Sequence, residues 1–236
     1  ANMCTTKRET HILKGVNTMN AKVARQIEEM KKQTIGVEVE MNNITRRKAA
    51  EIAAEHFGTG RFQDTSYRNG YAAWSAWDAQ DREWKFQRDS SITGPTEEKC
   101  EMVTPILTYA DMETLQGLIR KLRKAGAKSD PTRCCGVHIH IGAKGHTPQS
   151  LRNLANIMAS HESLLAKALT LDEYRMSQYC RTVDPNFLKR VNEEKPRTME
   201  ELSDLWYGSH YATYDRNDHY NDSRYHMLNL HATFTK

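Results

Sequence analysis

Cysteine is scarce in this chain, and the few cysteines present form no recognisable redox or metal motif. The 236 residues contain five cysteines; Cys134 and Cys135 are adjacent, and no Cys-x-x-Cys pair occurs. An odd count and neighbouring thiols argue against a disulfide framework. Disulfides belong to oxidising compartments, so we expect a reducing, cytoplasmic setting.

The signatures of several common protein classes are also missing. No apolar run approaches the roughly 20 residues of a membrane helix, and the first 20 residues lack the apolar segment of a signal peptide. We therefore expect neither a membrane span nor a leader. The phosphate-binding patterns GxxxxGK[ST] and GxGxxG are absent, as is the GxSxG nucleophile elbow. Any bound ATP must then be held by metals and arginines.

Net charge is low, and its excess lies at the N-terminus. The chain has 34 Lys and Arg against 30 Asp and Glu, and residues 1–32 contain seven of the basic and three of the acidic residues. The remaining residues carry 27 of each sign, so the body is neutral. Nucleic-acid binding proteins usually carry a basic patch on the folded body, so we do not expect a nucleic-acid partner.

The hydrophobic pattern alternates between strand and helix periods and predicts one α+β domain. We expect a flexible basic arm with a short helix over residues 1–32 and a single domain over 33–236. Residues 61–83 are polar and aromatic, as in a loop region, and Asn69-Gly70 within them is a hairpin signal. The predicted strands are 33–41, 84–91, 99–107, 134–142 and 223–234; the predicted helices are 20–32, 44–57, 108–126, 148–170 and one that begins at Thr198.

Two of these strands carry paired polar residues between aliphatic ones. In IGVEVE, Glu38 and Glu40 share a face about 7 Å apart, and in GVHIH the same holds for His138 and His140. Adjacent carboxylates repel each other when partly desolvated, and a divalent cation offsets that repulsion. Carboxylates with an imidazole suit Mg²⁺ or Mn²⁺.

Four other residues are candidates for the same site. Glu101 lies on a predicted strand with little other charge, and Asp89 ends the segment WKFQRD. Arg175 and Arg224 are candidate phosphate ligands because a guanidinium matches phosphate oxygens bidentately. Two alternatives remain open. The polar face can be a solvated sheet face, or His138 and His140 can bind zinc in a hydrolase, with Cys134 and Cys135 nearby.

The order of five motifs resembles one known family. The segments GVEVE, WKFQRDSS, CEMVTPIL, CGVHIHIG and RYHMLNL, in this order over about residues 33–235, are similar to the amidoligase family found in phages and mobile gene clusters. That family belongs to the carboxylate–amine ligases with a glutamine-synthetase-like fold. The resemblance implies a curved antiparallel sheet with helices on its convex face and the metals and ATP on its concave face. For a phage-encoded chain, the expected location is the host cytoplasm.

The resemblance also implies a reaction. Such enzymes phosphorylate a carboxylate with ATP, and an amine then attacks the acyl phosphate to form an amide or isopeptide bond. The implied substrate is an amino acid, peptide or protein carrying a carboxylate and an amine. The implied metal ligands, for Mg²⁺ or Mn²⁺, are Glu38, Glu40, Glu101 and His138.

The remaining implied roles concern ATP and the substrates. His140 would reach a phosphate oxygen, and Arg224 would neutralise charge as the γ-phosphoryl group moves. Glu101, Asp89 and Arg224 are then the implied catalytic residues. Asp89 matches the Asp of the family segment W-x-x-x-x-D-x-S and would bind a substrate. Arg175 and Tyr179 lie in a stretch resembling R-x-x-x-Y-C, for which a substrate role is implied.

The family pattern continues past the last motif into a strand reading like T-I-E-F-R, which supplies a further metal-binding Glu and a phosphate-binding Arg. The sequence ends in HATFTK, where that strand should begin, so we expect the domain to lack it. This leaves a second hypothesis beside the ligase: a binding protein that keeps the fold with impaired catalysis.

Overall fold

The computed structural model describes residues 20–68, 70–208, 212–218 and 220–235. Within these ranges the chain forms two compact units, the first ending at Gly142 and the second beginning at Ala143. The action of the two units as one domain stays a prediction. The first 19 residues of the predicted N-terminal arm lie outside the described ranges, and residues 20–31 are helical, as predicted.

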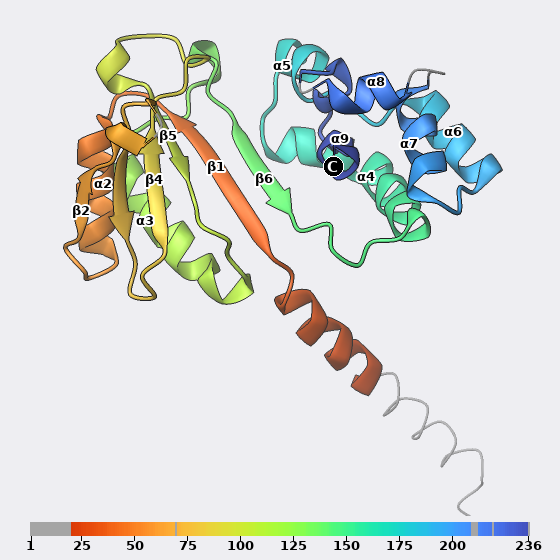
Figure 1. Ribbon diagram of the computed structural model, residues 1–236, viewed down its shortest axis with the longest axis horizontal. Coiled ribbons are helices and arrows are strands. Elements are labelled where there is room, and N and C mark those ends of the chain that lie inside the picture. The colour runs from red at the N-terminus through yellow and green to blue at the C-terminus, as the bar shows by residue number, and fades with distance from the viewer. Residues whose placement is uncertain (1–19, 69, 209–211, 219, 236) are drawn as a thin grey trace, which may run out of the picture. The chain divides into compact units, whose positions relative to one another are not determined.

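The first unit is built on one open antiparallel sheet, which confirms the predicted α+β class (Figure 1). Its order is β2-β3-β4-β5-β1-β6, with β2 and β6 at the edges. The six strands are β1 (Ile35–Met41), β2 (Phe62–Asp64), β3 (Trp74–Trp77), β4 (Glu83–Gln87), β5 (Cys100–Val103) and β6 (Val137–Ile141). The curvature and the glutamine-synthetase-like fold implied by the family stay predictions.

One face of this sheet is covered by two helices, α2 (Arg46–His56) and α3 (Met112–Lys124) (Figure 1). Successive side chains of a strand point to opposite faces, so alternate residues of β1, β4 and β5 enter this core. The largest of them, Trp84 and Phe86 on β4, are fully buried. Helix α2 offers mostly alanines to the sheet, which lets the helix axis approach closely. The other face of the sheet, the open face, carries the polar residues.

The helix boundaries follow the capping residues of the sequence. Thr45 caps α2 by accepting a hydrogen bond from the Lys48 N–H, and Thr147 and Thr198 form capping boxes at the starts of two later helices. These helices begin where the sequence predicted. Among the described residues, no helix combines the length and apolar character needed to cross a bilayer.

The second unit is helical. Phe187 and Trp206 meet edge to face in its core, with ring centroids 5.1 Å apart. Its helices are α4 (Pro148–Ala168), α5 (Glu173–Gln178), α6 (Pro185–Glu194), α7 (Met199–Tyr207), α8 (Ala212–Asn217) and α9 (His231–Phe234).

The strand predicted over 223–234 is wrong. The segment holds the end of a 3₁₀ turn (Asp222–Arg224), one isolated bridge between His226 and Arg181, and helix α9. The Arg181 side chain donates to the backbone carbonyl of Tyr225, and the Asn229 side chain accepts from the His231 N–H at the start of α9. These bonds satisfy backbone groups that a strand would have offered to a neighbour.

The segment 61–83 contains β2 and β3, which pair as an antiparallel hairpin. This agrees with the predicted hairpin, although Asn69 itself lies outside the described residues, and the interpretation as a loop region is wrong only for these two strands. The predicted strand 99–107 is interrupted: β5 ends at Val103, the Thr104 N–H still donates to the Val37 carbonyl, and a bridge forms again between Leu107 and Ile35. Pro105 lies between these points and has no N–H to donate to a ladder.

Candidate metal centre on the open face of the sheet

The strand registers place most of the predicted site residues on the open face. In the β1–β5 ladder Glu40 is directly opposite Glu101, and in the β4–β5 ladder Glu101 is opposite Gln87. Glu38 is opposite His138 in the β1–β6 ladder. Directly paired residues project to the same side of a sheet, so these side chains share one face.

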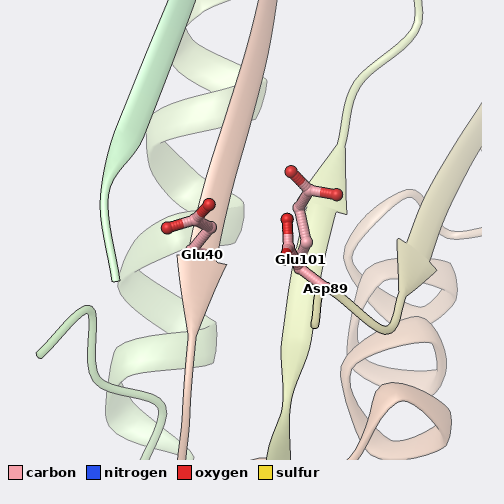
Figure 2. A group of neighbouring side chains, drawn as sticks. All are labelled: Glu40, Asp89 and Glu101. Atoms are coloured by element: carbon pink, nitrogen blue, oxygen red, sulfur yellow. The ribbon is translucent and has the colours of Figure 1, made fainter. Parts of the chain in front are cut away.

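Three carboxylates converge near one end of this face. Glu40 on β1, Glu101 on β5 and Asp89 just after β4 each place an oxygen within 4.8 Å of the others (Figure 2). Glu40 and Glu101 are only 7% and 6% exposed. We call these three residues the acid cluster. No other group of three His, Cys, Asp or Glu ligand atoms lies so close within the part of the chain that the structure describes.

Each carboxylate of the acid cluster is held by a neutral donor. The Gly136 N–H donates to Glu40 Oε2 at 2.6 Å, and the Gln87 amide donates to Glu101 Oε2 at 2.8 Å. Asp89 Oδ1 accepts from the Ser91 N–H at 2.6 Å. These bonds orient the oxygens of the three carboxylates.

The electrostatic strain of the cluster is concentrated on Glu101. Burial raises the pKa of this carboxyl to about 7, and the neighbouring charges of Glu38, Asp89 and Glu40 add to the increase, against the hydrogen bond from Gln87. A buried carboxylate among other carboxylates favours its neutral form unless a cation is present. Hard divalent cations take oxygen ligands of this kind, so the acid cluster fits Mg²⁺ or Mn²⁺.

Glu38 belongs to a second group on the same face. Its two oxygens contact His138 Nδ1 at 3.1 Å and His140 Nε2 at 3.2 Å. The hydrogen bonds from His138 and His140 lower the pKa of Glu38 to about 2, and the bond to Glu38 raises the pKa of both imidazoles. Glu38 thus bridges two imidazoles in this structure, and we call the three residues the imidazole bridge.

The structure therefore brings the residues predicted in the first unit together as two neighbouring groups. The predicted ligands Glu40 and Glu101 meet Asp89, which was predicted as a catalytic and substrate residue, whereas Glu38 meets the two histidines. The roles assigned to all six residues stay predictions.

The other three predicted residues lie in the second unit and share one aromatic cluster. The Arg175 guanidinium lies 5.3 Å from the Tyr179 ring centroid, and Arg224 lies 5.8 Å from that of Tyr225. The rings of Tyr179 and Tyr225 meet edge to face at 6.1 Å. Arg224 was predicted to begin the last strand, and this is wrong, because Arg224 ends a 3₁₀ turn.

Three features of the site were not predicted. Gln87 and the Gly136 N–H hold two of the acids. Asn42, the residue after the end of β1, is 2% exposed, and neither polar atom of its side chain has a hydrogen-bond partner among the described residues. The strand period offered a signal for Gln87, because residues 85, 87 and 89 alternate with Trp84 and Phe86.

The zinc alternative has less support. Cys135 is buried, and burial raises the pKa of its thiol, which disfavours the thiolate that zinc requires. The acid cluster contains neither sulfur nor imidazole, and Zn²⁺ favours both.

Comparison with known proteins gives one match. A protein-family model described as "Putative amidoligase enzyme" matches residues 31–236. Searches of curated proteins and of solved structures returned no match.

Proposed function

The chain belongs to this amidoligase family, and on that premise we propose that it is an ATP- and divalent-metal-dependent carboxylate–amine ligase. ATP would phosphorylate a carboxylate, and an amine would displace phosphate from the acyl phosphate to give an amide or isopeptide bond. The observation that carries the proposal is the acid cluster: three convergent carboxylates, two of them buried.

The chemistry of the acid cluster fits the metal that this reaction needs. Glu40, Asp89 and Glu101 would hold Mg²⁺ or Mn²⁺ through oxygen atoms. When bound, the cation supplies charge neutralisation and positioning for the phosphates, which phosphoryl transfer requires more than covalent help. The Gln87 amide and the Gly136 N–H keep the carboxylate oxygens in place.

The imidazole bridge has a second role in this proposal. Glu38 holds His138 and His140 by one oxygen each, and it favours their protonated, cationic forms. A protonated imidazole on the open face attracts a phosphate oxygen, the role assigned to His140. His138 would serve as a metal ligand only in its neutral form, after Glu38 or His138 turns toward the cation.

The acid and amine substrates are proposed to be amino acids, peptides or proteins. Arg175, Tyr179 and Arg224 support this proposal by their chemistry, because guanidinium groups stacked on tyrosine rings bind carboxylates and phosphates. Arg224 is the residue proposed to neutralise charge on the transferring phosphoryl group.

Phosphate release from ATP tests the function. The protein is incubated with ATP, Mg²⁺ and pools of amino acids or peptides, and products are identified by mass spectrometry. We expect phosphate release that depends on both an acid and an amine, and new products lighter by one water than the sum of the two substrates. Glu40→Ala should abolish both signals, while Glu97→Ala, which changes an exposed acid in a 3₁₀ turn away from the acid cluster, should leave them intact. Turnover that survives in Glu40→Ala would contradict the proposed site.

A further inference from the structure

Lys85 is the central residue of β4 and lies on the open face. It is directly opposite Val103 on β5 and Ser75 on β3, and Val103 is in turn opposite Glu38 on β1. Ladder partners share a face, so Lys85 projects to the same side of the sheet as the acid cluster and the imidazole bridge. Neither the sequence patterns nor the family resemblance gave this residue a role.

The open face is otherwise acidic. Among the open-face residues of the six strands, Lys85 is the only lysine or arginine, whereas the acids number four: Glu38, Glu40, Glu83 and Glu101. A carboxylate within reach of the Lys85 ammonium group would stabilise it by forming an ion pair. Lys85 is nevertheless exposed, and within the described ranges it makes no ion pair or hydrogen bond.

The neighbouring acids are engaged elsewhere. Glu83, two residues before Lys85 on the same strand, accepts from Ser75 Oγ at 2.7 Å and pairs with Arg68 at 3.1 Å. Glu38 bridges the two imidazoles. Lys85 therefore presents an unpaired positive charge beside a site that would hold cations and phosphates.

We infer that the Lys85 ammonium binds the phosphate tail of the nucleotide, beside the cation held by the acid cluster; this inference rests on the proposed function. The geometry permits it. Gln87 is directly opposite Glu101, and Lys85 is two residues away, about 7 Å along the strand. An extended lysine side chain spans a similar distance, and its ammonium binds phosphate oxygens as a point charge.

The charge balance favours such a group in addition to the roles proposed for His140 and Arg224. One divalent cation neutralises only part of a polyphosphate, and excess negative charge above an acidic sheet would be repelled by it. Glycine-rich phosphate loops are absent from the sequence. The Lys85 ammonium group adds a positive charge on the sheet itself, which offsets part of the phosphate charge that the metal does not neutralise.

Calorimetric titration with Mn²⁺, Mn²⁺·ADP and adenosine tests the inference on the full chain. In Lys85→Ala, we expect the Kd of Mn²⁺·ADP to rise about tenfold to a hundredfold, because a charge-assisted bond is lost. Binding of Mn²⁺ alone and of adenosine with Mn²⁺ should stay within a factor of about two, since neither presents a phosphate to the lysine. Lys85→Arg should keep most of the affinity for Mn²⁺·ADP.

Lys121→Ala is the matched control, because it removes an exposed lysine from α3 on the covered side of the sheet. It should bind all three probes as the unaltered protein does. If Lys85→Ala binds Mn²⁺·ADP as tightly as the unaltered protein, the inference about Lys85 is wrong, but the proposed function is not affected. If the unaltered protein binds Mn²⁺ but no adenine nucleotide, the proposed function fails and the inference with it.

Discussion

Glu40 and Glu101 lie directly opposite each other on adjacent strands, and both are almost completely buried. Like charges in directly opposed positions destabilise a sheet, and burial removes the water that would screen them. Neither residue contributes to the apolar core on the other face. A sheet that places two acids in this relationship gives up stability for a site that attracts cations.

Glu101→Gln tests this relationship through metal binding. The amide keeps the shape of the side chain but removes its charge, so we expect the affinity for Mn²⁺ to fall at least tenfold. The unfolding temperature without metal should stay equal or rise, because repulsion from Glu40 and Asp89 is relieved. Electron paramagnetic resonance of free Mn²⁺ measures the first effect, and thermal unfolding measures the second.

Glu97→Gln provides the control, since Glu97 is an exposed acid in a 3₁₀ turn. It should bind Mn²⁺ as tightly as the unaltered protein. Equal Mn²⁺ affinities for the two variants would remove the acid cluster from consideration as a metal centre.

The raised pKa of Glu101 predicts a pH dependence of metal affinity. Burial raises this pKa to about 7, so the carboxyl is mostly protonated at pH 6 and mostly charged at pH 8. We expect Mn²⁺ affinity to increase as the pH rises through 7, because the cation must displace the proton. Titrations at a series of pH values should show this rise, and Glu101→Gln should flatten it.

The same shift predicts how stability changes with pH in metal-free protein. The folded carboxyl keeps its proton up to about pH 7, whereas the unfolded one loses it near its ordinary value of 4.5. The folded state therefore binds more protons between pH 4.5 and 7, and this group's contribution to stability falls as the pH rises through that window. The expected loss is roughly 2–4 kcal/mol, measured by urea unfolding at fixed pH values. A stability curve that is the same in Glu101→Gln would contradict the shift.

The imidazole bridge predicts raised pKa values for two histidines, which proton NMR can measure. Contact with Glu38 raises the pKa of both His138 and His140, so both imidazoles should titrate above the ordinary histidine pKa of 6.5. In Glu38→Gln the charge is lost, and both titrations should move to lower pH. Signals of histidines elsewhere in the chain should stay in place. Unchanged titration of His138 and His140 in the variant would mean that the bridge does not form in solution.

Asp78 lies in the turn between β3 and β4, and we expect it to contribute strongly to the stability of the fold. It is 4% exposed and accepts hydrogen bonds from Arg82 Nε at 2.8 Å and Trp84 Nε1 at 3.0 Å. Asp78→Asn leaves Arg82 with Asp111 as its remaining carboxylate partner, and we expect a loss of about 3 kcal/mol in the free energy of unfolding.

Asp81→Asn is the matched variant for this measurement. Asp81 pairs with Arg61 at 2.6 Å, but both side chains are more than half exposed. Exposed ion pairs contribute less than about 1 kcal/mol, so this variant should unfold almost as the parent does. Similar losses from both substitutions would show that burial does not govern these two pairs.

The elements that the sequence predicted well have strong local signals. The strand at β1 alternates Val37 and Val39 with Glu38 and Glu40, and both termini of α4 lie close to the predicted ones. By contrast, β2 and β3 are three and four residues long, and Ser75 is fully buried in a hydrogen bond to Thr65. A buried polar residue in a short strand removes the apolar alternation on which the prediction depends.

The candidate site could be predicted only in part for a related reason. Local alternation gave the faces of Glu38 and Glu40, but the strand order β4-β5-β1 decides which acids meet. That order depends on long-range pairing, which short motifs do not encode. Glu40 therefore meets Asp89, 49 positions further along the chain, whereas Glu38, two positions before it, meets two histidines.

The two edges of the sheet differ in a way that affects how the protein behaves when concentrated. At one edge β2 has only three residues, too few to template another strand. At the other edge β6 is longer, and Val137, Ile139 and Ile141 are each more than half exposed. Aggregation of the protein should therefore proceed through β6. Charged substitutions at Val137, Ile139 or Ile141 are the first changes to test when the concentrated protein aggregates.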